Sequence, residues 1–123
     1  MKIYISHSTS FDFKKDLYQP LRDSDFSKNF ILPHEKSLKQ NTLKNIFSSK
    51  KCDLIIAEVS FPSTGQGIEL CLASIIYKIP IICFYKKNYN YSKALKDVSK
   101  KFVQYNDGKD LIEKIKKIIW YYQ

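Results

Sequence analysis

The chain has 123 residues, of which 44% are hydrophobic and 27% charged. This length and composition fit one compact domain, residues 1–123, and leave no room for a second core. The 21 basic and 12 acidic residues give a net charge of +9, which raises nucleic acid, anionic membranes and phosphorylated small molecules as partners. Only one basic residue, Arg22, is an arginine. Because proteins that read bases or clamp phosphates usually use the guanidinium fork, a nucleic-acid partner is not expected.

Composition also excludes several classes of protein. The chain has three glycines and four prolines, so it is not of low complexity, and its 15% aromatic residues supply material for a packed core. No apolar run approaches the roughly 20 residues that span a bilayer, and the N-terminal MKIYISHSTS turns polar too soon for a signal peptide. We therefore expect a cytoplasmic protein without a membrane partner. Cys52, Cys71 and Cys83 lack metal-ligand spacing, so we predict buried free thiols, no metal and no cofactor.

The first half of the chain alternates between strand-like and helix-like segments. Residues 2–6 (KIYIS) form a short β-branched and aromatic run that is typical of a strand. A helix is predicted over 10–23, with the serine at its start as N-cap, and Pro20 should end or kink it. Residues 29–33 (NFILP) are predicted to form a second strand, and apolar residues at helical spacing predict a helix over 38–50.

The second half continues the alternation. Residues 53–59 (DLIIAEV) form a nearly continuous apolar run, which indicates a strand buried on both faces. The turn-forming segment SFPSTGQG then leads into a predicted helix over 67–77, and PIICFY predicts a fourth strand over 80–85. The remaining predicted elements are a short helix over 92–99, an edge strand over 102–105 and a final helix over 109–121.

This βαβαβαβαβα order, with no internal repeat and no domain boundary, implies a parallel sheet covered by helices on both faces. The predicted fold class is α/β: a flavodoxin-like (Rossmann-like) three-layer sandwich around a five-stranded parallel sheet in the order 2-1-3-4-5. In such sheets, ligands bind beyond the carboxyl ends of the strands, near the switch point between strands 1 and 3.

The loops that follow the first three strands are therefore the candidate site. All three are polar, and the third is the richest, because hydroxyls and free backbone N–H groups converge where a helix begins, which suits a phosphate. Its residues are Ser63, Thr64, Gly65 and Gly67. Glu69 follows near the start of that helix, and an ionised carboxylate beside an anion-binding loop has a natural use as a nucleophile toward a sugar carbon.

The segment DLIIAEVSFPSTGQGIEL, residues 53–70, resembles the signature of the nucleoside 2-deoxyribosyltransferase family, most closely its branch of 2′-deoxynucleoside 5′-phosphate N-hydrolases. IYISHS, PIICFY and YSKAL resemble other parts of the family in the expected order. The resemblance implies a flavodoxin-like fold, a homodimer or higher homo-oligomer, and cleavage of the N-glycosidic bond by a glutamate nucleophile. By motif position that glutamate is Glu69.

The resemblance also implies roles for other residues. Tyr4 is similar to a tyrosine that supports the catalytic carboxylates. Ser63 and Gly65 are similar to positions that bind the 5′-phosphate, and Ser8 in the first loop is a further candidate. Ser92 is similar to a serine that completes the phosphate site of a neighbouring subunit, although a plain N-cap is the alternative for it.

One departure from the family pattern concerns the acid that helps the base depart. The family carries a second carboxylate on the helix before the third strand, and the matching position here is Asn45. Residues 36–52 contain no Asp or Glu, whereas glycoside cleavage normally uses two carboxyl groups. His34 and Glu35, which follow the second strand, are the nearest substitutes, and surface exposure is the alternative for His34.

The sequence therefore predicts an N-glycosidase that acts on nucleosides or nucleoside 5′-monophosphates, either as a hydrolase or as a deoxyribosyltransferase. One alternative is a binding module that keeps the phosphate loop but has lost catalysis with the change at Asn45. A TIR-like NAD glycohydrolase is a second alternative, because SHS after a first strand also occurs there, but it leaves PSTGQGIEL unexplained.

Overall fold

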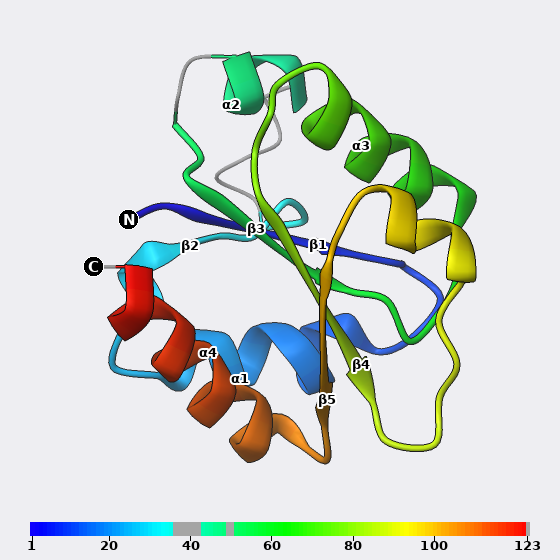
Figure 1. Ribbon diagram of the computed structural model, residues 1–123. Helices are drawn as coiled ribbons and strands as arrows, with labels where there is room; N and C mark the ends of the chain where they lie inside the picture. The colour runs from blue at the N-terminus through cyan, green and yellow to red at the C-terminus, as the bar shows by residue number, and fades with distance from the viewer. Residues whose placement is uncertain (36–42, 49–50, 123) are drawn as a thin grey trace.

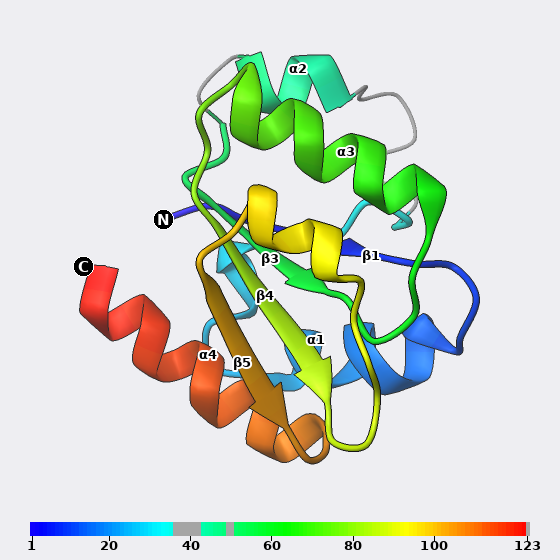
Figure 2. The same cartoon turned by 45° about the vertical axis from the view of Figure 1, so that its right-hand side comes forward.

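The fold is a single parallel sheet between two layers of helices. The computed structural model describes residues 1–35, 43–48 and 51–122. Five strands are hydrogen-bonded in the order β2-β1-β3-β4-β5, and every pair is parallel. Helices α2 and α3 cover one face of the sheet, and α1 and α4 cover the other, as the two views in Figures 1 and 2 agree. The predicted fold class and strand order are confirmed.

The elements follow the predicted sequence order. The strands are β1 (Ile3–His7), β2 (Phe30–Ile31), β3 (Leu54–Glu58), β4 (Ile81–Lys86) and β5 (Lys101–Tyr105). The α-helices are α1 (Gln19–Asp23), α2 (Leu43–Ser48), α3 (Thr64–Ile75) and α4 (Gly108–Tyr122). Shorter turns are the π-helical η1 (Lys14–Tyr18) and the 3₁₀ turns η2 (Ser27–Asn29) and η4 (Lys93–Asp97).

Side chains alternate between two cores along each inner strand. In β3, Leu54 and Ile56 pack in the core beneath α1 and α4, whereas Ile55 and Ala57 pack in the core beneath α2 and α3. The whole of β3 is buried, which explains why its sequence reads as a continuous apolar run instead of an alternating one. Glu58, the last residue of β3, therefore faces the side of α1 and α4.

The helical segment before β2 differs from the prediction. It begins at Lys14 rather than near Ser10, whose hydroxyl bonds to the Ser8 hydroxyl instead of capping a helix. Pro20 lies in the first turn of α1, directly after the wider π-helical turn η1. A proline is tolerated in the first turn of a helix, so Pro20 does not end the helical segment. Of the helix predicted over 38–50, residues 38–42 and 49–50 lie outside the described residues.

The register of the strands brings the candidate loops together. Ser6 lies opposite Ala57, and His7 lies opposite Glu58, so β1 and β3 end side by side. The loops that follow them share one edge of the sheet, as expected for ligand sites in this architecture. No helix in the described part of the chain is long and apolar enough to cross a bilayer. Cys52 and Cys83 are buried free thiols as predicted, whereas Cys71 is exposed on α3, contrary to the prediction.

Candidate active site

Glu69 lies in the second turn of α3, on the side of the helix that faces β1. One of its carboxylate oxygens, Oε1, is buried without a hydrogen-bonding partner in the described structure, and so is the hydroxyl of Ser6 in β1. Burial raises the pKa of Glu69 to about 7, and the nearby Ser6 and Tyr4 hydroxyls offset part of that rise. These two hydroxyls are therefore the groups that favour the ionised form of the carboxylate.

Tyr4 joins Glu69 from the same strand as Ser6. The tyrosine is 1% exposed, and its ring packs edge-on against Phe47 of α2 at 5.4 Å between centroids. Burial raises the pKa of Tyr4, and the negative charge of Glu69 raises it further, so the hydroxyl stays protonated and able to donate to the carboxylate. The structure thus brings together the tyrosine and the glutamate that the sequence resemblance paired.

The loop before α3 has the geometry of a helix cap. The helix begins at Thr64, three residues earlier than predicted, with Ser63 as N-cap whose Oγ accepts a hydrogen bond from the Gln66 amide at 3.4 Å. Gly65 and Gly67 consequently lie in the first turn. A Cβ at Gly67 would meet nothing within 4 Å, and at Gly65 it would meet only Ser63 Oγ at 4.0 Å, so packing does not require either glycine. The space above the helix start remains open.

A cavity of about 470 Å³ and another of about 610 Å³ lie near this edge. The larger one, between α3 and η4, is lined by Ser63, Thr64 and Gly67 together with Ser92 of the same chain. Gly65 and Glu69 are not among its lining residues. Ser92 is the N-cap residue of η4, which is the alternative predicted for it, although its side chain makes no capping hydrogen bond there.

The loop after β1 is held in place by hydrogen bonds among its own residues and with Tyr18. Ser8 is buried, and its hydroxyl bonds to the Ser10 hydroxyl at 2.8 Å and accepts from the Ser10 amide at 3.1 Å. His7 Nδ1 lies 2.8 Å from the Ser8 carbonyl, and Nε2 lies 2.6 Å from the Tyr18 hydroxyl. A carbonyl only accepts, so Nδ1 carries the proton and Nε2 accepts from Tyr18. Burial lowers the pKa of His7 to about 4, which agrees with this neutral ring.

The same tyrosine holds the second loop. The Tyr18 hydroxyl accepts a hydrogen bond from the His34 backbone amide at 3.1 Å, so it ties the end of β1 to the loop after β2. The His34 side chain is exposed, and its ring contacts are with His7 at 5.3 Å and Phe13 at 5.2 Å between centroids. These contacts are on the side that η1 covers, and Glu69 is not among them.

Glu35 and Asn45 have surroundings that the sequence did not predict. Both oxygens of Glu35 accept from Arg22, at 2.8 Å and 2.5 Å, and this pairing lowers the pKa of Glu35. A carboxylate that is paired with a guanidinium is a poor proton donor, so the structure argues against Glu35 as the acid. Asn45 is exposed on α2, the helix that shares a face of the sheet with α3.

A second buried glutamate at the same edge was not predicted as part of a network. Glu58 is 2% exposed, and its carboxylate accepts from the Ser60 amide at 2.6 Å, from the Ser60 hydroxyl at 3.0 Å and from the Tyr105 hydroxyl. Burial raises the pKa of Glu58, while these donors and Lys86 act against the rise. Glu58 was visible in the sequence as an acidic residue near the end of the apolar run over 53–59, but no short motif links it to Tyr105.

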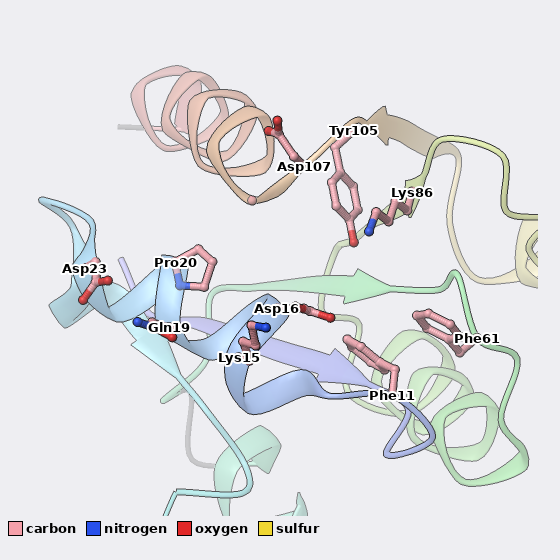
Figure 3. A pocket seen from close by; sticks show the side chains of 11 residues that line it. Phe11, Lys15, Asp16, Gln19, Pro20, Asp23, Phe61, Lys86, Tyr105 and Asp107 are labelled. Atoms are coloured by element: carbon pink, nitrogen blue, oxygen red, sulfur yellow. The ribbon is translucent and has the colours of Figure 1, made fainter.

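The 470 Å³ cavity lies on the Glu58 side of the sheet. Figure 3 shows Tyr105 and Lys86 extending into it from the ends of β5 and β4, with Phe11 and Phe61 on the opposite wall. The two phenylalanine rings are stacked at 4.5 Å between centroids. This contact packs the loop after β1 against the loop after β3.

No family model matches the chain. Two curated proteins do: a putative 2′-deoxynucleoside 5′-phosphate N-hydrolase 1 of Methanosarcina barkeri, 45% identical over 42 residues, and its namesake of Methanosarcina mazei, 39% identical over 56 residues. The aligned segments cover 34% and 42% of this chain, but only 26% and 34% of those proteins.

Among solved structures, a CMP N-glycosidase of Clostridium botulinum has a similar fold. Its TM-score is 0.60 at 23% identity, over 94% of this chain and 99% of that one. At this identity the likeness concerns the fold. The predicted resemblance is confirmed: part of the chain is similar to curated 2′-deoxynucleoside 5′-phosphate N-hydrolases, and its fold is similar to that of the CMP N-glycosidase.

Proposed function

We propose that the protein is an N-glycosidase of nucleoside 5′-monophosphates in which Glu69 is the nucleophile. The observation that carries this proposal is the buried carboxylate oxygen Oε1 of Glu69 beside the hydroxyls of Ser6 and Tyr4, which favour the ionised form of the carboxylate. An ionised carboxylate is the form that attacks, and Tyr4 holds it in place.

The reaction would run in two steps. The Glu69 carboxylate forms a bond to the sugar C1′, and the C1′–N bond breaks with its electron pair passing to the base, which takes up a proton. Water then attacks C1′, the ester bond to Glu69 breaks, and the sugar phosphate leaves. In a transferase, the nitrogen of a second base would replace the water.

The phosphate would be held by the start of α3. Ser63, Thr64, Gly65 and Gly67 lie at the first turn, where the helix dipole favours an anion. Ser92 joins Ser63 on the wall of the same cavity, and Ser8 lies in the adjacent loop. This arrangement favours a 5′-phosphorylated substrate over a free nucleoside, and the names of the similar proteins support the same class.

The departing base needs a proton that a second carboxylate would ordinarily supply. Residues 36–52 contain no carboxylate, and Glu35 is paired with Arg22, so His34 is the proposed donor. An imidazole is suited to proton transfer near neutral pH. The exposed His34 ring contacts His7 and Phe13 on the side that η1 covers, so it would have to turn toward the α3 side to serve as this donor.

The test is the release of free base from a panel of deoxyribonucleoside and ribonucleoside 5′-monophosphates, the matching nucleosides and NAD. We expect release from one or more monophosphates and much slower release from nucleosides and NAD. Activity on NAD alone would favour the TIR-like alternative. No release by the wild-type protein at high concentration would refute the catalytic proposal.

A nucleotide-binding module is the second candidate, and the asparagine at position 45 is the observation that favours it. A module of this kind would bind a nucleoside monophosphate through the α3 loop and leave it intact. Calorimetry, followed by chromatography of the titrated nucleotide, separates the two functions, because an enzyme returns free base and a binding module returns the nucleotide.

We further propose that the outer face of α3 binds a second copy of the chain. Ile68, Ile75 and Ile76 are 57%, 58% and 61% exposed there, beside the exposed Cys71 and the 610 Å³ cavity. A contiguous apolar surface of this kind is typical of protein interfaces. Light scattering should give at least a dimer for the wild type, and Ile75→Glu should shift it to a monomer. A monomeric wild type would contradict the proposal.

A further inference from the structure

We infer that Glu58 is a positioning residue for the loop between β3 and α3, and that its buried carboxylate thereby sets the affinity of the loop for the 5′-phosphate of a nucleotide. The inference deepens the proposed function and rests on it, because this loop is the proposed phosphate site. Glu58 itself lies on the opposite face of the sheet from Glu69, so it acts through the loop and not on the reacting atoms.

Glu58 holds the beginning of the loop through its side chain. The carboxylate accepts from both the backbone amide and the hydroxyl of Ser60, two residues further on. The Ser60 hydroxyl, in turn, accepts from the Lys86 backbone amide at 2.7 Å, and the Val59 amide donates to the Phe84 carbonyl at 2.8 Å. The chain is therefore fixed against the end of β4 until it turns toward Ser63.

Glu58 holds the end of the loop through its backbone. Its carbonyl oxygen accepts from the side-chain amide of Gln66 at 2.9 Å, and Gln66 is 6% exposed in the first turn of α3. The Gln66 backbone amide in turn donates to the Ser63 hydroxyl. Glu58 is thus hydrogen-bonded at both ends of the segment that contains Ser63, Thr64 and Gly65. These hydrogen bonds fix the position of the Ser63 cap.

Tyr105 anchors the carboxylate from the edge of the sheet. Its hydroxyl donates to Glu58 Oε2, and its carbonyl accepts from the Lys87 amide at 2.8 Å, so β5 and β4 are tied together behind the glutamate. Figure 3 shows the Tyr105 ring extending from the end of β5, with Lys86 beside it. The two oxygens of an ionised carboxylate accept several hydrogen bonds and neither of them donates one, whereas the side-chain amide of a glutamine would also bring two N–H donors. This explains a glutamate at this buried position.

The first experiment measures loop order directly. Tyr105→Phe and Ser60→Ala each remove one hydroxyl donor to Glu58, and Tyr85→Phe is the matched control, because the Tyr85 hydroxyl on β4 makes no hydrogen bond to the described residues. We expect amide hydrogen exchange over residues 60–67 to accelerate by about tenfold in the two network variants and to stay unchanged in the control.

The second experiment measures phosphate affinity with CMP and cytidine as probes, titrated calorimetrically into chains that also carry Glu69→Gln to prevent turnover. We expect CMP to bind about tenfold more weakly in Tyr105→Phe and Ser60→Ala, and cytidine to bind as in the parent. Ser60→Thr, which keeps the hydroxyl, should restore the affinity for CMP.

The outcomes separate this inference from the proposed function. Equal weakening for CMP and cytidine, or unchanged exchange over residues 60–67, overturns the positioning role. If the parent chain binds neither CMP nor cytidine, the proposed function fails and the phosphate part of the inference fails with it. The exchange data then still decide whether Glu58 orders the loop.

Discussion

Two glutamates at one edge of the sheet have opposite surroundings. Glu58, on the side of α1 and α4, receives hydrogen bonds from Ser60 and Tyr105, whereas Glu69, on the side of α3, has an oxygen with no partner in the described structure. Burial raises the pKa of both carboxyl groups. Burial is therefore common to the two carboxylates, and their hydrogen-bonding surroundings are what set the proposed nucleophile, Glu69, apart from Glu58.

The largest expected effect concerns the reaction itself. Glu69→Gln should lower the rate of base release by roughly a thousandfold or more, because the amide is not a nucleophile. Glu58→Gln should change kcat less than about threefold and act mainly on KM. Steady-state kinetics with the best monophosphate of the panel measures both. Similar losses in kcat for the two variants would remove the distinction between the glutamates.

The next effect is on the free energy of unfolding at pH 8, which should fall when Glu58 is replaced and stay unchanged or rise when Glu69 is replaced. Glu58→Ala leaves the Ser60 and Tyr105 donors unpaired and should cost about 3 kcal/mol of the free energy of unfolding. The folded pKa of Glu69, about 7, exceeds its ordinary value of 4.5, so its contribution to stability is present below pH 4.5 and is lost as the pH rises through 7. Glu69→Ala should therefore be neutral or stabilising at pH 8. Urea unfolding at pH 5 and pH 8 checks both signs.

A smaller effect tests the source of the proton for the leaving base. Asn45→Asp should raise kcat by about tenfold if position 45 faces the leaving group, because a general acid contributes to the rate of glycoside cleavage. His34→Gln should lower kcat by about tenfold in the wild-type background and by less in the Asn45→Asp background. Additive effects of the two changes would argue against a shared role.

The smallest effect is a pH dependence. Because ionised Glu69 is the proposed nucleophile and its pKa is about 7, kcat/KM of the His34→Gln variant, which lacks the proposed proton donor, should rise by up to about tenfold between pH 6 and pH 8. His7, with a pKa of about 4, should contribute nothing in this range. A flat profile from pH 6 to pH 8 would place the ionisation of the nucleophile elsewhere.

The fold was predictable because each element carries its own local signal. The apolar run of β3 and the helical spacing in α4 predicted a sheet that is covered by helices on both faces. The order of the elements predicted the order of the strands. The start of α3 was placed too late, since the two glycines near it hide the helix signal that the cap at Ser63 supplies. The turn at η1 was not foreseeable from Pro20 alone.

The candidate site was predictable only where one segment contains it. Ser63 and Glu69 belong to a single stretch of sequence, but Ser6, Tyr105 and the pairing of Arg22 with Glu35 depend on contacts between distant segments. Periodicity indicates which face of an element is apolar. It contains no information on which polar side chains meet across the sheet.

The sheet also separates the proposed reaction site from the hydrogen bonds that hold the loop between β3 and α3. Asn45 and Glu69 lie in the helix layer on one face, while Tyr105 and the Glu58 carboxylate that fasten the loop lie on the other. Substitutions that alter chemistry on the first face leave the internal hydrogen bonds of the second untouched. A lineage with this architecture can change the residue at the proposed leaving-group position and still inherit a folded loop between β3 and α3, the proposed phosphate site, on which a new activity can be selected.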